Sequence, residues 1–154
     1  MSAADWIQTI GIFIAFIGIL VAIYFNKKQL KELNRHLRLQ FFADYTKRFQ
    51  EVMLNLPENI MDNDFDIDGL NQEDYSKTMR YLRSYFDLCS EEFDLWKSGN
   101  IERRIWMNWE EGIRSKMSNK AFVYAWKKSN YDSYYYPEFS KWMNQIIEGN
   151  KPNN

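Results

Sequence analysis

Cysteine, histidine and glycine are scarce in this chain of 154 residues, which contains one Cys, one His and six Gly. A single thiol, Cys89, excludes an intrachain disulfide framework and fits a reducing compartment. A single imidazole, His36, limits metal sites to carboxylate ligands. The chain has no glycine-rich phosphate loop, Cys-x-x-Cys, His-Glu-x-x-His or nucleophile-elbow motif. The sequence therefore predicts no cofactor and no enzymatic activity.

Neither sign of charge is in excess, with 20 Lys and Arg against 21 Asp and Glu and a net charge of -1. A nearly neutral chain gives no electrostatic reason to expect binding to duplex nucleic acid. The charges are nevertheless segregated, because residues 26–50 carry seven basic residues against two acids. Residues 51–74 carry eight acids and no base. We expect a basic helix followed by an acidic turn.

Residues 6–25, WIQTIGIFIAFIGILVAIYF, form an apolar stretch without charge in which only Gln8 and Thr9 are polar. Because about 20 apolar residues in a helix cross ~30 Å of hydrocarbon, we predict a transmembrane helix here. A cleavable signal peptide is disfavoured, since Asp5 stands where a signal carries Lys or Arg and no small-residue cleavage site follows. A buried core helix is the other interpretation, but soluble helices normally carry shorter uncharged runs.

The two flanks of this span predict its orientation. The tail 1–5 contains one acid and no Lys or Arg, whereas five basic residues follow the span closely. The positive-inside rule therefore places the tail outside and the remainder of the chain in the cytoplasm. Aromatic rings at the two ends suit the two membrane interfaces. The predicted interface residues are Trp6, Tyr24, Lys27, Lys28, Lys31, Arg35 and Arg38.

Small residues recur along the span at steps of four, three and four, and therefore share one helical face. In lipid, a face of small residues allows two helices to approach closely. We expect self-association through this face, although Gly and Ala are also common in spans by composition alone. The face consists of Gly11, Ala15, Gly18 and Ala22.

No Pro or Gly occurs between Gly18 and Pro57, so the helix is predicted to continue beyond the membrane to about Leu56. Apolar residues recur on this juxtamembrane helix every three or four positions. Three interpretations remain open: a helix lying over anionic headgroups, a coiled-coil stalk, and a solvated helix face. The apolar stripe begins with Leu30, Leu33, Leu37 and Phe41.

The acidic stretch contains the run DNDFDIDG, the most motif-like segment of the chain. Four of its residues match positions one, three, five and six of an EF-hand calcium loop, namely Asp64, Asp66, Asp68 and Gly69. The match then fails, because the bidentate Glu of position twelve is replaced by Tyr75. We therefore favour a solvated acidic turn over a calcium site.

The next segment gives the clearest helix signal. A helix is expected to begin after the cap Asn71, to carry apolar residues at steps of four and three as far as Trp96, and to end before Gly99. Its apolar face includes Cys89, which we therefore assign to the core. The short link that contains Gly99 predicts an antiparallel hairpin with the following helix.

Three shorter helices are predicted at about 101–117, 118–128 and 138–148, with Ser118 as a cap and Pro137 in the last first turn. The fold class is therefore all-α: a transmembrane helix continuing into a juxtamembrane helix, then a small bundle of about four helices. The predicted domains are a tail at 1–5, a transmembrane helix at 6–25, a basic juxtamembrane helix at 26–56, a helical domain at 57–149 and a polar tail at 150–154.

Two pairs of adjacent acids, on helices that are expected to pack together, are candidates for general acid–base chemistry. Glu91 and Glu92 form one pair, and Glu110 and Glu111 form the other. Neighbouring helical residues point about 100° apart, which does not suit two carboxylates acting on one substrate. Solvated faces with intrahelical ion pairs, such as Glu110 with Arg114, explain them better.

The last third of the chain combines aromatic rings with lysines. Rings that stack on bases and cations that meet phosphates could hold a nucleotide or single-stranded RNA. Core packing together with a tyrosine-rich protein contact explains the same residues and is the favoured interpretation. The candidate contact residues are Lys120, Lys127, Lys128, Tyr134, Tyr135 and Tyr136.

The stretch YLRSYFDLCSEEFDLWKSGNI, from Tyr81 to Ile101, continues as WMNWEEGI from Trp106. It resembles a group of small bacterial proteins with an N-terminal membrane helix and a helical domain rich in Tyr and Trp. The resemblance implies a bacterial inner-membrane protein and carries over no catalytic or ligand residues. In layout, the chain is also similar to membrane effectors of bacterial antiviral signalling, whose cytosolic helical domain senses a nucleotide messenger.

We therefore expect a single-span inner-membrane protein whose cytosolic helical domain binds a partner protein or self-assembles, without catalysis. Its expected partners are the lipid bilayer, further copies of the chain and a partner protein. The alternative is a membrane effector of bacterial defence. In that case a small anionic or nucleotide ligand binds the soluble domain and acts through oligomerised transmembrane helices.

Overall fold

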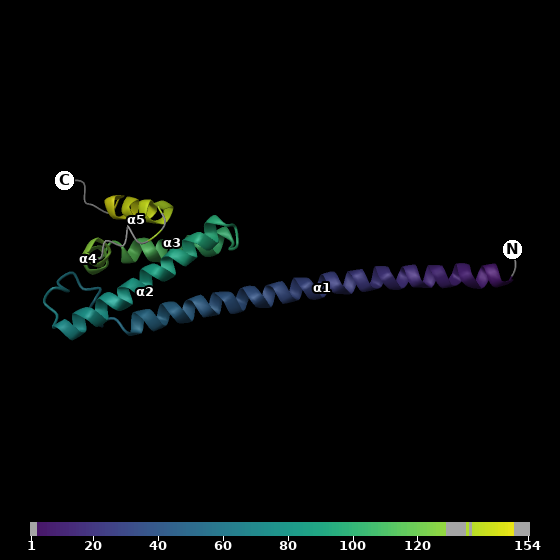
Figure 1. Cartoon of the computed structure of the whole chain (residues 1–154), viewed down its shortest axis with the longest axis horizontal. Helices are drawn as coiled ribbons and strands as arrows, with labels where there is room; N and C mark the ends of the chain where they lie inside the picture. Colours follow the sequence, from purple (N-terminus) through teal and green to yellow (C-terminus); the bar gives the residue numbers. More distant parts are fainter. Residues whose placement is uncertain (1–2, 129–134, 136, 150–154) are drawn as a thin grey trace. The chain divides into compact units, whose positions relative to one another are not determined.

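The computed structural model describes residues 3–128, 135 and 137–149 (Figure 1). Regular structure in these residues is entirely helical, which confirms the all-α prediction. Within them the helices are α1 (Ala3–Leu54), α2 (Gln72–Lys97), α3 (Arg103–Lys116), α4 (Lys120–Lys128) and α5 (Pro137–Gly149).

The chain forms two compact units, Met1–Asp44 and Tyr45–Asn154. Helix α1 is continuous over 52 residues, so that its last turns belong to the second unit. This continuity confirms that the helix extends past the apolar run. It follows from the absence of Pro and Gly between Gly18 and Pro57, because neither a ring clash nor a flexible residue interrupts the backbone ladder.

Helix α2 begins and ends where local chemistry predicts. The Asn71 side chain accepts a hydrogen bond from the backbone N–H of Asp74 at 2.9 Å and donates one to the Asp74 carboxylate at 2.7 Å. These two bonds cap the N-terminus. Past the C-terminus, Gly99 has a φ of +73° and its N–H donates to the Trp96 carbonyl at 3.0 Å. Only glycine adopts this left-handed conformation without strain.

The cap predicted for α4 is wrong by one residue. The Ser118 hydroxyl donates to the carbonyl of Ser115 at 2.7 Å and so belongs to the end of α3. The buried Asn119 is the actual cap, because its side-chain oxygen accepts from the N–H of Ala121 at 2.8 Å. Its amide group also donates to the carbonyl of Met61 at 3.1 Å, which ties α4 to the acidic turn.

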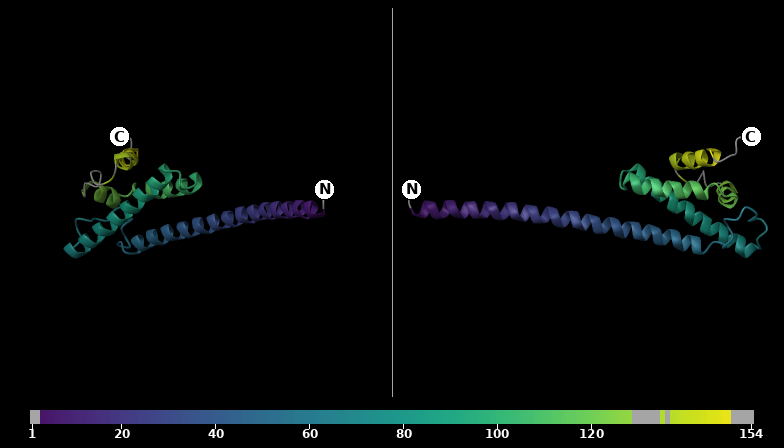
Figure 2. Two further views of the ribbon diagram at one scale, coloured as in Figure 1. Left: turned by 45° about the vertical axis from the view of Figure 1, so that its right-hand side comes forward. Right: turned by 180° about the vertical axis from the view of Figure 1, so that it is seen from behind.

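One hydrophobic core fills the second unit, and aromatic rings supply much of its volume. Helix α2 packs against α3 and α4, and both views of Figure 2 show α2 and α3 side by side. Trp96 stacks on Trp106 with ring centres 4.7 Å apart, whereas Trp126 meets Phe86 edge to face at 5.2 Å. Cys89 is 1% exposed, which confirms its assignment to the core. The core comprises Val52, Leu56, Ile60, Ile67, Leu82, Tyr85, Phe86, Cys89, Phe93, Trp106, Ile113, Met117, Ala121, Phe122, Ala125, Trp126, Phe139, Met143, Ile146 and Ile147.

Candidate functional site

The apolar run at the start of α1 is exposed. Its large apolar side chains between Trp6 and Phe25 are between 47% and 73% exposed, at positions that cover every face of the helix. In the part of the chain that the structure describes, α1 is the one helix long and apolar enough to cross a membrane.

The residues predicted to lie at the membrane interfaces and on the small-residue face are all exposed on α1. A Cβ atom at Gly11 or Gly18 would meet no other atom within 4 Å, so this face has room for a closely approaching neighbour. The exposed residues are Trp6, Gly11, Ala15, Gly18, Ala22, Tyr24, Lys27, Lys28, Lys31, Arg35 and Arg38.

The aspartates of the calcium-like run do not gather around an ion position. Tyr124 donates a hydrogen bond to the Asp68 carboxylate, and the Asp66 carboxylate accepts the backbone N–H of Asp68 at 3.1 Å. Among the described residues, no group of three or more His, Cys, Asp or Glu side chains is arranged to hold a metal ion. The turn is not fully solvated either, because Ile60 and Ile67 anchor it in the core.

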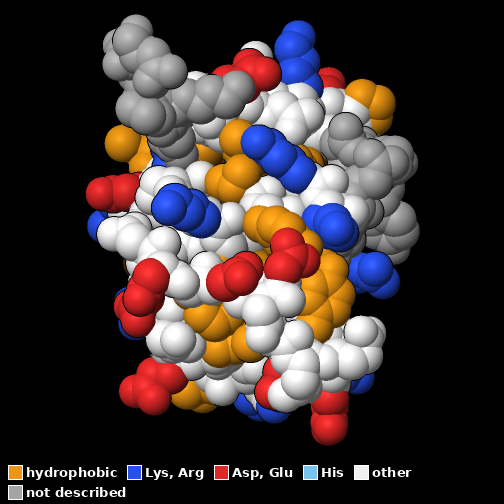
Figure 3. All heavy atoms as spheres, turned by 90° about the vertical axis from the view of Figure 1, so that its left-hand side faces the viewer, with side chains coloured by type: hydrophobic (Ala, Val, Ile, Leu, Met, Phe, Trp, Pro, Cys, Tyr) orange, Lys and Arg blue, Asp and Glu red, His pale blue; other side chains and the backbone are white. Residues whose placement is uncertain are grey.

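The lysines of the aromatic–basic candidate site lie exposed on α4. They are Lys120, Lys127 and Lys128, and the amino group of Lys128 lies 5.8 Å from the centre of the Tyr124 ring. Figure 3 shows one face of the molecule, on which side chains of both charges lie with apolar surface between them.

Of the three consecutive tyrosines, Tyr135 lies among the described residues, while Tyr134 and Tyr136 lie outside them. The ring of Tyr135 stacks on Trp126 with centres 5.7 Å apart and planes 4° apart. Its hydroxyl donates to the Asp87 carboxylate at 2.7 Å. Tyr135 therefore packs on the core and is hydrogen-bonded to α2.

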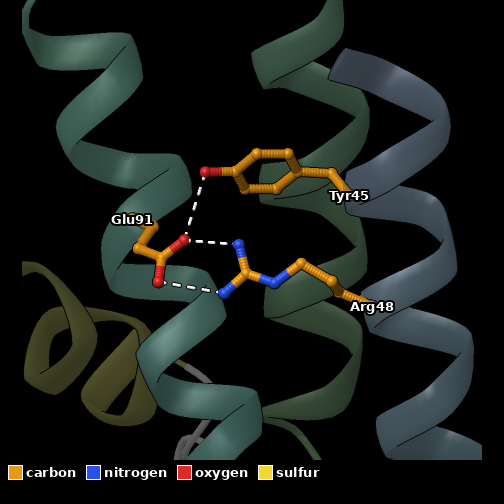
Figure 4. A network of polar contacts seen from close by, with 3 residues as sticks. All are labelled: Tyr45, Arg48 and Glu91. Carbon is orange, nitrogen blue, oxygen red and sulfur yellow. Dashed lines mark hydrogen bonds and ion pairs between the residues drawn. The ribbon is translucent and has the colours of Figure 1, made fainter. Parts of the chain in front are cut away.

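A second constellation, which the sequence analysis did not predict, joins the last turns of α1 to α2 (Figure 4). The guanidinium of Arg48 donates two hydrogen bonds to the Glu91 carboxylate, from Nη1 to Oε2 at 2.6 Å and from Nη2 to Oε1 at 3.0 Å. The Tyr45 hydroxyl donates to the same carboxylate at 3.2 Å, and its ring stacks on Trp109 of α3 at 5.3 Å. The hydrogen bonds from Arg48 hold the pKa of Glu91 below its usual value.

Glu92 lies next to this ion pair in sequence, but its side chain is buried at 7% exposure. The prediction of a solvated face is therefore wrong for Glu92. The predicted intrahelical ion pair is confirmed for Glu110, which accepts from Arg114 at 2.6 Å. Burial raises the pKa of Glu92 to about 8, an effect that Arg48 opposes and the charge of Glu91 reinforces. At neutral pH the folded protein therefore holds Glu92 mainly as the uncharged acid.

Cys89 and Tyr85 complete this region of the core, and their side chains share a hydrogen bond. Burial raises the pKa of both groups well above their usual values, and the nearby Glu92 adds to the rise. A buried thiol that keeps its proton is a poor nucleophile. This arrangement is suited to holding α1 against α2. The Arg48–Glu91 ion pair lies at its partly exposed edge, and the uncharged side chains of Tyr85, Cys89 and Glu92 are buried in the core.

The sequence does contain a signal for Glu92. It lies four residues after Leu88 and three after Cys89, on the apolar face of α2. An acid on the apolar face of a helix is expected to be buried, and this position distinguishes Glu92 from the exposed Glu91. The Arg48–Glu91 pair has no comparable signal, because its members come from different helices and are separated by 43 residues.

Comparisons with protein-family models, with curated proteins and with solved structures found no match to this chain.

Proposed function

We propose that this chain is a single-span membrane protein whose helical second unit lies in the cytoplasm and mediates self-assembly or protein binding without catalysis. The exposure of the apolar run of α1 carries this proposal. Each large apolar side chain left in water forgoes about 1.5–3 kcal/mol of burial free energy. A bilayer removes that cost, and the helix satisfies its own backbone groups there.

The flanking residues support an orientation with the N-terminus outside. The five exposed basic residues that follow the run favour the cytoplasmic side, which attracts them through its anionic lipids. Trp6 and Tyr24 stand at the two ends of the run, and amphipathic rings of this kind favour the membrane interface. In a bacterium, the inner membrane offers both a cytoplasmic face with anionic lipids and two interfaces that suit aromatic rings.

A binding role is favoured over catalysis by the state of the groups that could react. Cys89 and Glu92 are buried, and Glu91 is held by Arg48. The second unit instead offers an aromatic-rich core, to which the last turns of α1 contribute Val52.

The alternative, a ligand-gated membrane effector, is favoured by the same continuity of α1. One helix carries the apolar run and also supplies Val52 and Arg48 to the second unit. A ligand that rearranged this unit would therefore act on the membrane segment through a single helix. The exposed cations of α4 would meet an anionic ligand; they are Lys120, Lys127 and Lys128.

Expression of the full chain in bacterial cells separates the two functions. Membrane potential is followed with a voltage-sensitive dye, with and without a nucleotide messenger, and the mass of the detergent-solubilised protein is measured in parallel. A stable oligomer or complex with unchanged potential agrees with the assembly function. Depolarisation that requires the nucleotide, and that is lost when Lys127 and Lys128 are replaced by Ala, supports the effector instead.

A further inference from the structure

We propose that α1 pairs in parallel with a second copy of this chain along a seam formed by Leu30, Leu33 and Leu37, just beyond the apolar run. The inference rests on the proposed membrane anchoring, because a bilayer inserts both copies in the same orientation and brings their helices out side by side. It adds to the proposed function the surface of contact and the identity of the partner.

The first observation is a heptad arrangement of the leucines that follow the apolar run. With Leu30 at position a, Leu33 and Leu37 occupy the next d and a positions, and Asn26 occupies the preceding d position. Helix α1 is unbroken over this stretch, so these residues share one face. The pattern ends at Gln40, which occupies the next d position. Outside the apolar run the seam consists of Leu30, Leu33 and Leu37, with Asn26 at its start.

The second observation is that the charges of the basic segment avoid this seam. The flanking e and g positions are filled by the uncharged Gln29 and Asn34 and by His36, while Lys27 is the one charged residue beside it. A strongly basic helix can therefore approach its own copy without bringing most of its like charges together. The charged residues at the outward b, c and f positions are Lys28, Lys31, Glu32, Arg35 and Arg38.

The third observation is the exposure of the seam beyond the apolar run. Leu30, Leu33 and Leu37 are 58%, 54% and 52% exposed. They stand in the segment that leaves the hydrocarbon, where an apolar stripe gains from being covered. Asn26 falls at the boundary between the two parts. A polar residue inside such a seam favours the register that sets it against its own counterpart.

A second copy fits this stripe better than a lipid surface does. To lay the leucines on headgroups, the helix would have to change direction between the apolar run and the basic segment. Sharp kinks in helices occur at Pro, at Gly or where the backbone ladder is interrupted. Helix α1 has no interruption over Ala3–Leu54 and no Gly or Pro after Gly18.

Cysteine cross-linking of the full chain in isolated membranes tests the pairing. Single cysteines replace the seam residues Leu30, Leu33 and Leu37 in three variants, and the outward residues Lys31 and Arg35 in two matched controls. Buried Cys89 remains in place, and the unmodified chain is the blank. After oxidation, we expect a disulfide-linked dimer at the three seam positions and its loss at the two outward ones, because the bond requires Cβ atoms about 3.5–4.5 Å apart.

Several outcomes would overturn the pairing. One is equal cross-linking at all five positions, and another is no cross-linking at any of them. The third is protection of the seam cysteines from an aqueous maleimide without formation of a dimer, which would place the leucines on lipid. Adding Leu37→Asp to Leu30→Cys is expected to abolish the dimer, whereas adding Arg35→Gln is expected to preserve it.

Alkaline extraction of the same membranes distinguishes the two proposals. If the chain stays in the membrane but does not show the periodic pattern of cross-linking, the pairing fails and the anchoring stands. If the chain is extracted yet still cross-links at the seam positions, the anchoring fails and the pairing stands.

Discussion

Glu92 makes the stability of the helical second unit fall as pH rises. Its pKa is 4.5 as an ordinary glutamate and about 8 in the folded chain. Between these values the folded state holds a proton that the unfolded state has released. The contribution to stability is therefore fully present below pH 4.5 and is lost as pH rises through 8. At ~1.4 kcal/mol for each tenfold change in proton affinity, the loss from about pH 6 to about pH 9 amounts to about 2–3 kcal/mol.

The substitution Glu92→Gln removes this proton but keeps the size of the side chain. Chemical unfolding of the full chain in detergent, followed by tryptophan fluorescence, reports mainly on the second unit. Five of the six tryptophans belong to that unit: Trp96, Trp106, Trp109, Trp126 and Trp142. We expect the free energy of unfolding of the variant to lack the alkaline fall, so that its advantage over the natural chain grows with pH.

Glu91→Gln is the matched control. Glu91 is already ionised in this range, and its charge raises the pKa of Glu92. The control should therefore keep the fall and move it to lower pH. Parallel stability curves for the natural chain and Glu92→Gln between about pH 6 and pH 9 would refute the reasoning, because Glu92 would then be ionised in both folded and unfolded states.

Three further predictions concern a helix cap, an ion pair between two helices and a buried thiol. Asn119→Ala should lower the free energy of unfolding by about 0.5–2 kcal/mol, measured by chemical unfolding, with a smaller effect for Ser118→Ala; equal effects would contradict the cap assignment. A double-mutant cycle with Arg48→Met and Glu91→Gln should give a coupling of about 0.5–1 kcal/mol that weakens with salt, since both side chains are nearly half exposed; a salt-independent value would argue against the ion pair. Cys89 should resist thiol reagents at neutral pH until the chain is unfolded, and rapid labelling of the folded chain would show that it is not buried.

The boundaries of the helices could be predicted where local chemistry decides them. Asn71 caps α2 through a residue three positions away, and Gly99 supplies a backbone conformation that other residues avoid. The cap of α4 was missed because Ser118 and Asn119 are both good caps. The choice depends on the carbonyl of Met61, which is 58 residues from Asn119 in sequence.

Some features of the candidate site could likewise be predicted from the sequence, and others could not. The exposed apolar run of α1 and the burial of Cys89 follow from periodicity and composition. The Arg48–Glu91 pair does not, because charges on two separate helices give no sign of which will meet. The stacking of Tyr135 on Trp126 could not be predicted either, since a ring followed by lysines and tyrosines is equally typical of a binding surface.

The orientation of α1 in a membrane is the central claim and can be measured directly. Ser2→Cys and Asn100→Cys place a thiol before the apolar run and in the exposed turn between α2 and α3, and a membrane-impermeant maleimide is applied to intact cells. We predict labelling of Ser2→Cys in intact cells, labelling of Asn100→Cys only after lysis, and retention of the chain in alkali-washed membranes. Release of the chain by alkali, or labelling of Asn100→Cys in intact cells, would contradict the account.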